Sequence, residues 1–184
     1  MENKITVFYY IKDEYIDQLK KVSANITENK TMNRPYIGVV IQSSVHNYFV
    51  PMMSPKPKHI EMRNTLDFMK IKNGKLGALN FNNMIPVSQE NAILLEIEDV
   101  KDALYKNLLL EQRNWILSNE DRIVSKAKNL YDKFKNNRLP QNIRSRCVDF
   151  IAIENFLNQK KDLKRENASA VIKLNKPTGK GIER

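Results

Sequence analysis

The sequence contains few of the residues from which disulfide-linked, zinc-binding and membrane-spanning proteins are built. Cys147 is the single cysteine among 184 residues, so no internal disulfide can form, as is usual in a reducing cytoplasm. The two histidines, His46 and His59, cannot complete a Cys/His zinc site with one thiol. There is no apolar run of about 18 residues and no signal-peptide core near Met1. We therefore expect a cytoplasmic protein that is neither exported nor membrane-spanning.

The short motifs of several large enzyme classes are also missing. The sequence has no glycine-rich dinucleotide loop, no nucleotide-phosphate loop, no His-Glu-x-x-His and no Gly-x-Ser-x-Gly. These absences argue against nucleotide-cofactor enzymes, zinc proteases and α/β-hydrolases. We expect no cofactor and no metal site.

Positive charge is what the sequence has in excess. It holds 31 Lys+Arg against 21 Asp+Glu, a net charge of +10 and a pI of about 9.6. Half of this surplus lies in residues 160–184, which carry eight basic and three acidic side chains. Such a balance favours a polyanionic partner, although a merely solvated basic surface would look the same. We predict one domain over residues 1–159 and a basic C-terminal extension over residues 160–184.

The two halves of that domain differ in pattern and together predict an α+β fold. Residues 5–97 are rich in β-branched and aromatic residues, whereas residues 99–159 show helical periodicity and contain no glycine. A helix capped by Asp13 should continue to Ile26. We expect a sheet of five to seven strands, with strands at residues 5–11, 36–41, 48–50, 68–72, 75–79, 84–87 and 93–97.

Two turns and three helices complete the expected fold. Ser43 to Asn47 should join two central antiparallel strands, and Asn73-Gly74 predicts a type I′ hairpin turn. Helices are expected over residues 100–117, from a cap at Ser118 to Pro140, and over residues 149–159. The face of the first that should lie against the sheet carries Val100, Ala103, Leu104, Leu108, Leu110, Trp115 and Leu117.

Residues 51–59 hold the candidate chemistry. Prolines stiffen this segment, and it presents the hydroxyl of Ser54, two ammonium groups and an imidazole (Lys56, Lys58, His59). If the two central strands pair, Arg34 at the start of the first lies beside the end of the second. Cations and a hydroxyl that converge in this way suit a phosphodiester; a rigid basic loop is the alternative. His59 is the one nearby group that titrates near neutrality, and so a candidate acid or base.

The same residues resemble the ToxN/AbiQ family of endoribonuclease toxins, which belong to type III toxin–antitoxin systems and act in phage abortive infection. The resemblance spans about residues 4–158 and leaves the basic extension unmatched. It is carried by Arg34-Pro35-Tyr36-Ile37-Gly38-Val39-Val40, Tyr48-Phe49-Val50-Pro51-Met52-Met53-Ser54-Pro55-Lys56-Pro57-Lys58-His59, Gly77-Ala78-Leu79-Asn80-Phe81-Asn82-Asn83-Met84-Ile85-Pro86-Val87, Tyr105-Lys106-Asn107-Leu108-Leu109 and Gln112-Arg113-Asn114-Trp115-Ile116.

This resemblance implies a compact, strongly twisted, barrel-like antiparallel sheet with flanking helices, similar to the MazF/Kid toxins. It implies metal-independent cleavage of cellular or phage RNA that leaves a 2′,3′-cyclic phosphate and a 5′-hydroxyl. It also implies inhibition by a small repetitive RNA, whose pseudoknot-like units pack with toxin subunits into a closed assembly.

Individual roles follow from the same resemblance. Ser54 matches the family's active-site serine, and Lys56 matches the lysine two positions later. Arg34 stands where other members have a basic residue, and Met53 occupies a position that is a hydroxyl residue in some of them. Some members also have an active-site tyrosine upstream of the basic residue. No tyrosine lies between Tyr15 and Tyr36 in this chain, so we expect that contact to be either absent or supplied by another residue, with Lys30 and Tyr36 as the candidates.

Further RNA contacts are expected from the basic residues of the second half. Lysines of the helix before Pro140, together with Lys58 and the extension, are the candidates (Lys126, Lys128, Lys133 and Lys135). A noncatalytic RNA-binding protein on an SH3-like barrel remains the alternative to the nuclease. A DNA-binding regulator is disfavoured by the mostly β first half and by the absence of a helix-turn-helix pattern.

Overall fold

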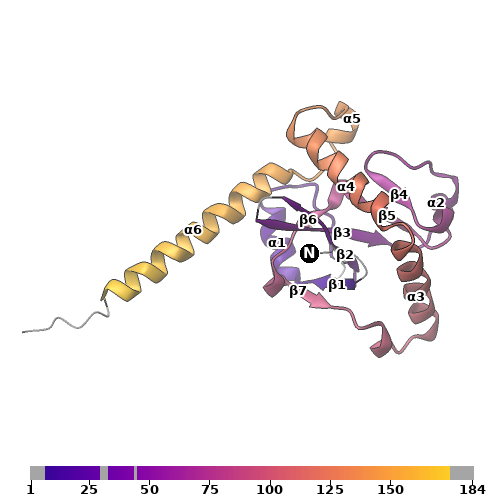
Figure 1. Ribbon diagram of the computed structural model, residues 1–184, viewed down its shortest axis with the longest axis horizontal. Coiled ribbons are helices and arrows are strands. Elements are labelled where there is room, and N and C mark those ends of the chain that lie inside the picture. The colour runs from indigo at the N-terminus through magenta and orange to yellow at the C-terminus, as the bar shows by residue number, and fades with distance from the viewer. Residues whose placement is uncertain (1–6, 30–32, 44, 175–184) are drawn as a thin grey trace, which may run out of the picture.

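The computed structural model describes residues 7–29, 33–43 and 45–174, and it shows an antiparallel sheet with helices packed around it (Figure 1). The sheet has seven strands in the order β4-β5-β3-β2-β1-β7, and β6 pairs separately with β3. The strands are β1 (Val7–Ile11), β2 (Tyr36–Ser43), β3 (His46–Met53), β4 (Phe68–Lys70), β5 (Ala78–Asn80), β6 (Ile85–Pro86) and β7 (Ala92–Leu94).

This arrangement confirms the predicted α+β class and antiparallel sheet. The barrel-like closure does not occur within the described residues, because the path of paired strands ends at β4 and β7 without joining them. The sheet is therefore open.

The β2–β3 hairpin is the centre of the sheet. Ile37, Val40 and Val50 are completely buried, as expected for strands with apolar residues on both faces. The pairing register shifts between Ile37 and Ile41. Gly38 lies in this irregular stretch, and the ring of Phe49 fills the space that a Cβ atom would take there. A side chain at this position would therefore displace the Phe49 ring from the core.

Six helices surround the sheet within the described part of the chain. They are α1 (Asp13–Lys20), α2 (Pro57–Glu61), α3 (Ala103–Leu117), α4 (Glu120–Lys135), α5 (Gln141–Arg144) and α6 (Phe150–Leu174). No helix in the described ranges combines the length and apolarity needed to cross a bilayer.

Four of these helices were predicted, with errors in several details, whereas the short helices α2 and α5 were not predicted. α1 ends at Lys20 rather than Ile26, and Asp13 lies in its first turn instead of capping it. Asn119 rather than Ser118 precedes α4. The largest error concerns α3, which buries Leu109, Gln112 and Ile116, whereas Leu104 is 84% exposed. Because apolar residues surround this helix on several sides, periodicity alone chose the wrong face.

The β4–β5 hairpin is confirmed, but its turn is longer than predicted. Asn73 and Gly74 have the positive φ values of 55° and 91° that a type I′ turn would need. Lys72 also has positive φ, and the strands pair only from Lys70 and Ala78 outward. Residues 71–77 therefore form a wide loop with a 3-10 turn.

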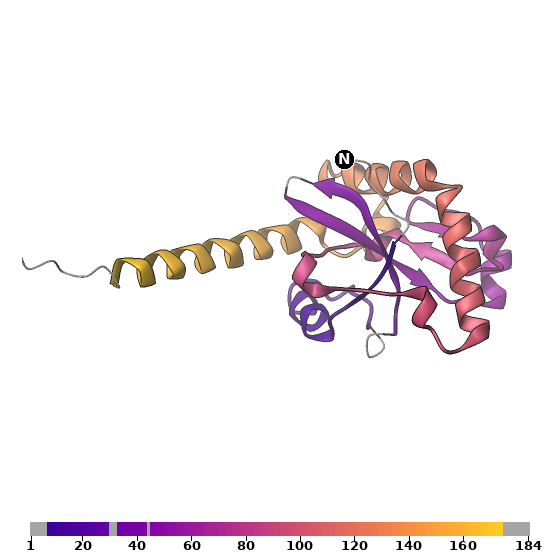
Figure 2. The same cartoon turned by 60° about the horizontal axis from the view of Figure 1, so that its bottom comes forward.

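α6 does not end at Gln159 as predicted but continues to Leu174. Its first turns are held by Glu154, whose carboxylate accepts hydrogen bonds from the hydroxyls of Tyr48 (2.8 Å) and Tyr131 (2.9 Å). Figures 1 and 2 show the rest of this helix extending away from the body. The basic extension therefore begins inside a continuous helix.

A buried ion pair joins the loop before β4 to the segment before α6. Both nitrogen–oxygen distances between the Arg146 guanidinium and the Asp67 carboxylate are short, 2.6 and 2.7 Å, and the Asp67 side chain is 3% exposed. Burial would raise the pKa of Asp67, but hydrogen bonds from Arg146 and Thr65 outweigh it and hold that pKa below its ordinary value.

We predict that Asp67→Asn lowers the free energy of unfolding by about 2 kcal/mol at neutral pH, less than a fully buried pair costs because Arg146 is half-exposed. A carboxyl with a lowered folded-state pKa stabilises the protein above its unfolded pKa, about 3.9, and loses this contribution as the pH falls through the folded value. The difference from wild type should therefore shrink below about pH 4.

Urea unfolding at several pH values measures this effect. The control is Asp162→Asn, which removes an exposed pair with Arg165 at 3.8 Å and should cost less than about 0.5 kcal/mol. Equal losses in both variants would contradict the structural role of Asp67.

Candidate active site

The open end of the β2–β3 hairpin brings the predicted site residues together. Tyr36 pairs with Pro51, and the Met52 amide donates a 2.8 Å hydrogen bond to the Pro35 carbonyl. This register carries the chain just before β2 alongside the chain just after β3. A hollow of about 60 Å³ results, lined by Asn33, Arg34, Pro35, Met52, Met53, Ser54 and Lys56.

The hollow is electropositive. Among the described residues, its lining has two charged side chains, those of Arg34 and Lys56, and no carboxylate. The Arg34 Nε atom donates to the Glu28 carbonyl at 3.1 Å, which orients the guanidinium, and its terminal nitrogens have no hydrogen-bond partner among the described residues. Ser54 and Lys56 are exposed on the extended segment between β3 and α2. The site therefore offers a hydroxyl and two cations to a ligand from solvent.

A second hollow of about 210 Å³ adjoins the first and shares five lining residues with it, Asn33, Pro35, Met52, Met53 and Ser54. Its other wall comes from Tyr10 on β1 and from α3, which supplies Tyr105, Leu108 and Gln112. Burial and a hydrogen bond with Tyr10 raise the pKa of Tyr105, so its hydroxyl stays protonated. Neither tyrosine was predicted as a site residue, because both lie on elements far from Ser54 in the chain. Tyr105 belongs to a segment that carries the family resemblance, but that segment alone indicates no role for its hydroxyl.

The wide 71–77 loop packs against the backbone at the end of β3 and so supports the site. Gly77 has φ +93°, and a Cβ atom there would collide with the Met53 carbonyl. The loop is in turn held by α3, because Gln112 donates to the Leu76 carbonyl at 2.7 Å and Lys72 pairs with Glu111 at 2.8 Å. The position of the Met53–Ser54 backbone thus depends on a close approach that only glycine permits.

Comparison with known proteins identifies the family. A sequence model of the family described as "Toxin ToxN, type III toxin-antitoxin system" matches residues 7–158. This chain belongs to that family.

Two relatives and two solved structures extend the ToxN likeness. Endoribonuclease ToxN of Bacillus thuringiensis subsp. kurstaki is 29% identical over 163 residues, covering 84% of each chain. Endoribonuclease ToxN of Pectobacterium atrosepticum is 32% identical over 133 residues, covering 67% of this chain and 78% of that protein. The solved structure of a type III toxin, which is selectively inhibited by a non-coding RNA pseudoknot, aligns with a TM-score of 0.72 and 28% identity, over 84% of this chain and 97% of the other. The lactococcal anti-phage endoribonuclease AbiQ, 22% identical with a TM-score of 0.72 over 84% and 97% of the two chains, shares the fold.

Several residues predicted for the ToxN site lie outside both hollows. His59 is completely buried on α2 against Phe68, with no hydrogen-bond partner for either ring nitrogen among the described residues. Burial, Lys58 and Lys56 lower its pKa, in that order of effect. Tyr36 is 2% exposed, and burial raises its pKa to about 12. Neither ring is therefore exposed to a ligand at this surface, and the tyrosines that line the adjoining hollow are Tyr10 and Tyr105.

The predicted lysines are spread more widely. Lys58 is exposed on α2 but does not line the hollows, and Lys30 lies outside the described residues. The α4 lysines also lie away from both hollows: Lys126 is half-buried beside Phe81, and Lys135 lies over Tyr131, while Lys128 and Lys133 complete the set. RNA contacts by these residues stay predictions.

We predict that Gly77→Ala destabilises the protein by about 2 kcal/mol, because it adds left-handed backbone strain to a collision with the Met53 carbonyl. Asn73→Gly, in the same loop at φ 55°, should instead be neutral or slightly stabilising. Urea unfolding of the two variants checks this, and a neutral Gly77→Ala would contradict the support that the loop gives to the site.

Proposed function

We propose that this chain is an endoribonuclease toxin whose site is the hollow formed by Arg34, Ser54 and Lys56. The observation that carries the proposal is the convergence of two cations and a hydroxyl at the open end of the β2–β3 hairpin. Membership of the ToxN family and relatives that are endoribonucleases support the reaction class.

The reaction that suits this inventory uses the RNA as its own nucleophile. A ribose 2′-oxygen attacks the adjacent phosphorus, the O2′–P bond forms and the P–O5′ bond breaks. The 2′-hydroxyl loses its proton to a base and the departing 5′-oxygen gains one, so the products are a 2′,3′-cyclic phosphate and a 5′-hydroxyl. The protein then needs to supply orientation and charge stabilisation rather than a nucleophile of its own.

Each side chain has a distinct role in this scheme. Arg34 and Lys56 bind the non-bridging oxygens, which gain negative charge as the phosphorus becomes five-coordinate. Ser54 donates a hydrogen bond to one of these oxygens or positions the 2′-hydroxyl; its own pKa is too high for a base near neutrality. His59 has no part in proton transfer here, because its ring is buried away from the hollow.

The adjoining hollow can align the RNA for this reaction. In-line attack requires the nucleotide beside the scissile phosphate to be held in one orientation, and unstacked RNA bases pack on aromatic side chains. Tyr10 and Tyr105 form one wall of that hollow, and the side chains of Asn33 and Gln112 add amide groups. We assign this hollow to a base next to the cleaved bond.

Control of the toxin follows from the same surface. A related type III toxin is selectively inhibited by a non-coding RNA pseudoknot. We propose that a small folded RNA inhibits this chain by occupying the catalytic hollow as an uncleaved substrate, in a closed assembly of toxin and RNA units. Its substrate, cellular or phage RNA, places its action in the cytoplasm and in antiviral defence.

The first functional prediction concerns Ser54. Ser54→Ala should abolish growth inhibition on expression and lower RNA cleavage by roughly a hundredfold or more, because one preorganised donor to the transition state is lost. Ser125→Ala on α4 is the control, since its exposed hydroxyl lies away from the hollow. Unchanged toxicity of Ser54→Ala at equal expression would contradict the site.

The second separates catalysis from binding. Lys56→Gln or Arg34→Gln should lower the single-turnover rate at saturating RNA by roughly tenfold or more, because the developing charge loses a cation. Lys58→Gln, two residues after Lys56 and outside the hollow, should change affinity while keeping that rate. If Lys56→Gln also changed affinity alone, Lys56 would be a binding residue only.

The noncatalytic alternative is tested directly by incubating the purified protein with a long RNA in EDTA. Discrete new 5′-hydroxyl ends, absent with Ser54→Ala, support the nuclease. RNA that is bound and stays intact would favour the binding protein.

A further inference from the structure

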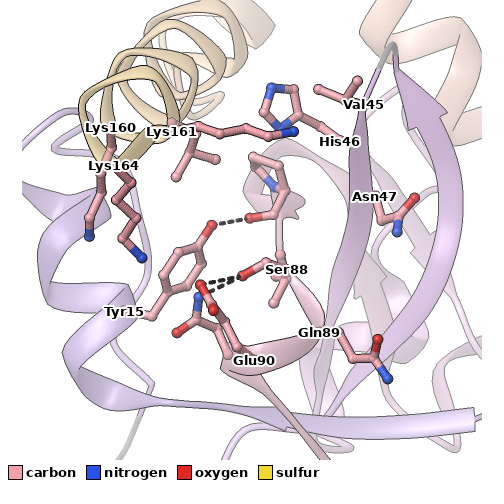
Figure 3. A pocket seen from close by; sticks show the side chains of 14 residues that line it. Tyr15, Val45, His46, Asn47, Ser88, Gln89, Glu90, Lys160, Lys161 and Lys164 are labelled. Carbon is pink, nitrogen blue, oxygen red and sulfur yellow. Dashed lines mark hydrogen bonds between the residues drawn. The ribbon is translucent and has the colours of Figure 1, made fainter. Parts of the chain in front are cut away.

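A larger cleft lies at the other end of the β2–β3 hairpin. It measures about 800 Å³ and is bounded by the hairpin turn, the segment after β6 and the middle of α6. Figure 3 shows Lys160, Lys161 and Lys164 projecting from α6 over this space, opposite Tyr15 and Ser88. Nothing in the catalytic scheme uses this cleft.

The charge of the cleft is positive and accessible. Three lysines face a single carboxylate, Glu90, which accepts a 3.4 Å hydrogen bond from Ser88. The Lys160 ammonium donates to the Gln18 side chain. Lys161 and Lys164 are exposed, and neither forms an ion pair within the part of the chain that the structure describes. Two ammonium groups are therefore available to an anion.

The walls of the cleft are held in place. The Tyr15 hydroxyl donates to the Pro86 carbonyl at 2.6 Å, which joins α1 to the end of β6. His46 at the hairpin turn and Asn158 on α6 lie within hydrogen-bond distance, 3.0 Å, just before the three lysines. Together with the anchoring of Glu154, this contact fixes where the lysines emerge. The cleft is a formed feature of the fold rather than a chance gap beside a free helix.

We propose that this cleft is a second RNA-binding site that holds the phosphate backbone, with the amides of Asn47 and Gln89 available to base edges. The proposal rests on the nuclease function above. A concave, amide-lined surface with unpaired ammonium groups fits a phosphodiester strand better than the flat surface of a membrane. Lipid phosphate is therefore an outcome of the test rather than the proposal.

The two sites can serve one RNA. β3 has eight residues, so the hairpin turn and the catalytic hollow are separated by about 25 Å. An RNA that reaches both sites gains affinity from the second without any change in the chemistry at the first. The family match ends at residue 158, two residues before the first of the three lysines. The lysines of the proposed second site therefore lie on the part of α6 that the family match does not cover.

The salt dependence of RNA binding tests the site. The probe is a fluorescent, fully 2′-O-methylated oligouridylate, which lacks the attacking hydroxyl and stays intact. Lys161→Gln/Lys164→Gln should flatten the slope of log affinity against log salt by about 1.4, or about 0.7 for each lost phosphate contact on a single strand. The matched control Lys101→Gln/Arg138→Gln removes the same charge from exposed positions outside the cleft and should keep the slope.

Photo-crosslinking locates the contact. An oligonucleotide containing 4-thiouridine should crosslink to residues 86–91 or 157–164 of the wild type, and these crosslinks should be lost in the double lysine variant. A methylated stem-loop is compared with the single strand. A larger loss for the single strand indicates substrate RNA in the cleft, and a larger loss for the stem-loop indicates the folded inhibitor; either supports the proposal.

A failure of the second site can be distinguished from a failure of the nuclease function by measuring cleavage of a short RNA that reaches only the catalytic hollow. The double variant should cleave it at the wild-type rate. If the wild type does not cleave RNA, the nuclease proposal fails. The salt dependence of RNA affinity and the crosslinks then still show whether RNA binds in the cleft. The second site would be overturned if the two double variants gave equal salt slopes, or if crosslinks were confined to residues 33–56. It would also be overturned if the double lysine variant lost binding to phosphatidylglycerol vesicles but kept its RNA binding.

Discussion

The antiparallel register of β2 and β3 is the constraint on which the rest of the molecule depends. The 2.8 Å bond from the Met52 amide to the Pro35 carbonyl brings the segment before one strand beside the segment after the other. A shift of one residue would turn every side chain of a strand to the opposite face and separate Arg34 from Ser54. The completely buried Ile37, Val40 and Val50 resist such a shift, because it would replace their close-packed neighbours on both faces with mismatched ones. The apolar core thus sets the geometry of a polar site at its edge.

The same hairpin gives the molecule two ends with different chemistry. At its open end the backbone is supported by the 71–77 loop, whose Gly77 allows contact with the Met53 carbonyl, and the exposed groups suit a reacting phosphate. At its turn the supporting element is α6, and the exposed groups are lysines that have no role in the proposed reaction. Precise catalytic geometry is therefore built on short-range backbone contacts, whereas the proposed second site needs only charge at a fixed position.

Local patterns were sufficient for most elements and for the site residues that one hairpin brings together. Alternating and β-branched residues predicted the strands, and their pairing predicted that Arg34 lies near Ser54. Patterns failed where tertiary packing decides. The apolar residues around α3 left its buried face undetermined, and the structure selects Leu109 and Ile116. Tyr10 and Tyr105 meet only because β1 and α3 converge in space, and the burial of His59 depends on packing against Phe68 from β4.

The catalytic hollow is proposed to orient an RNA so that its own 2′-hydroxyl attacks the adjacent phosphorus. The most direct measurement replaces the one ribonucleotide before the mapped cleavage site by its 2′-deoxy form and follows single-turnover cleavage by the wild-type protein. The account predicts that binding is kept while cleavage at that bond disappears, because the nucleophile has been removed. Continued cleavage at the modified position would show that another nucleophile acts and would contradict the account.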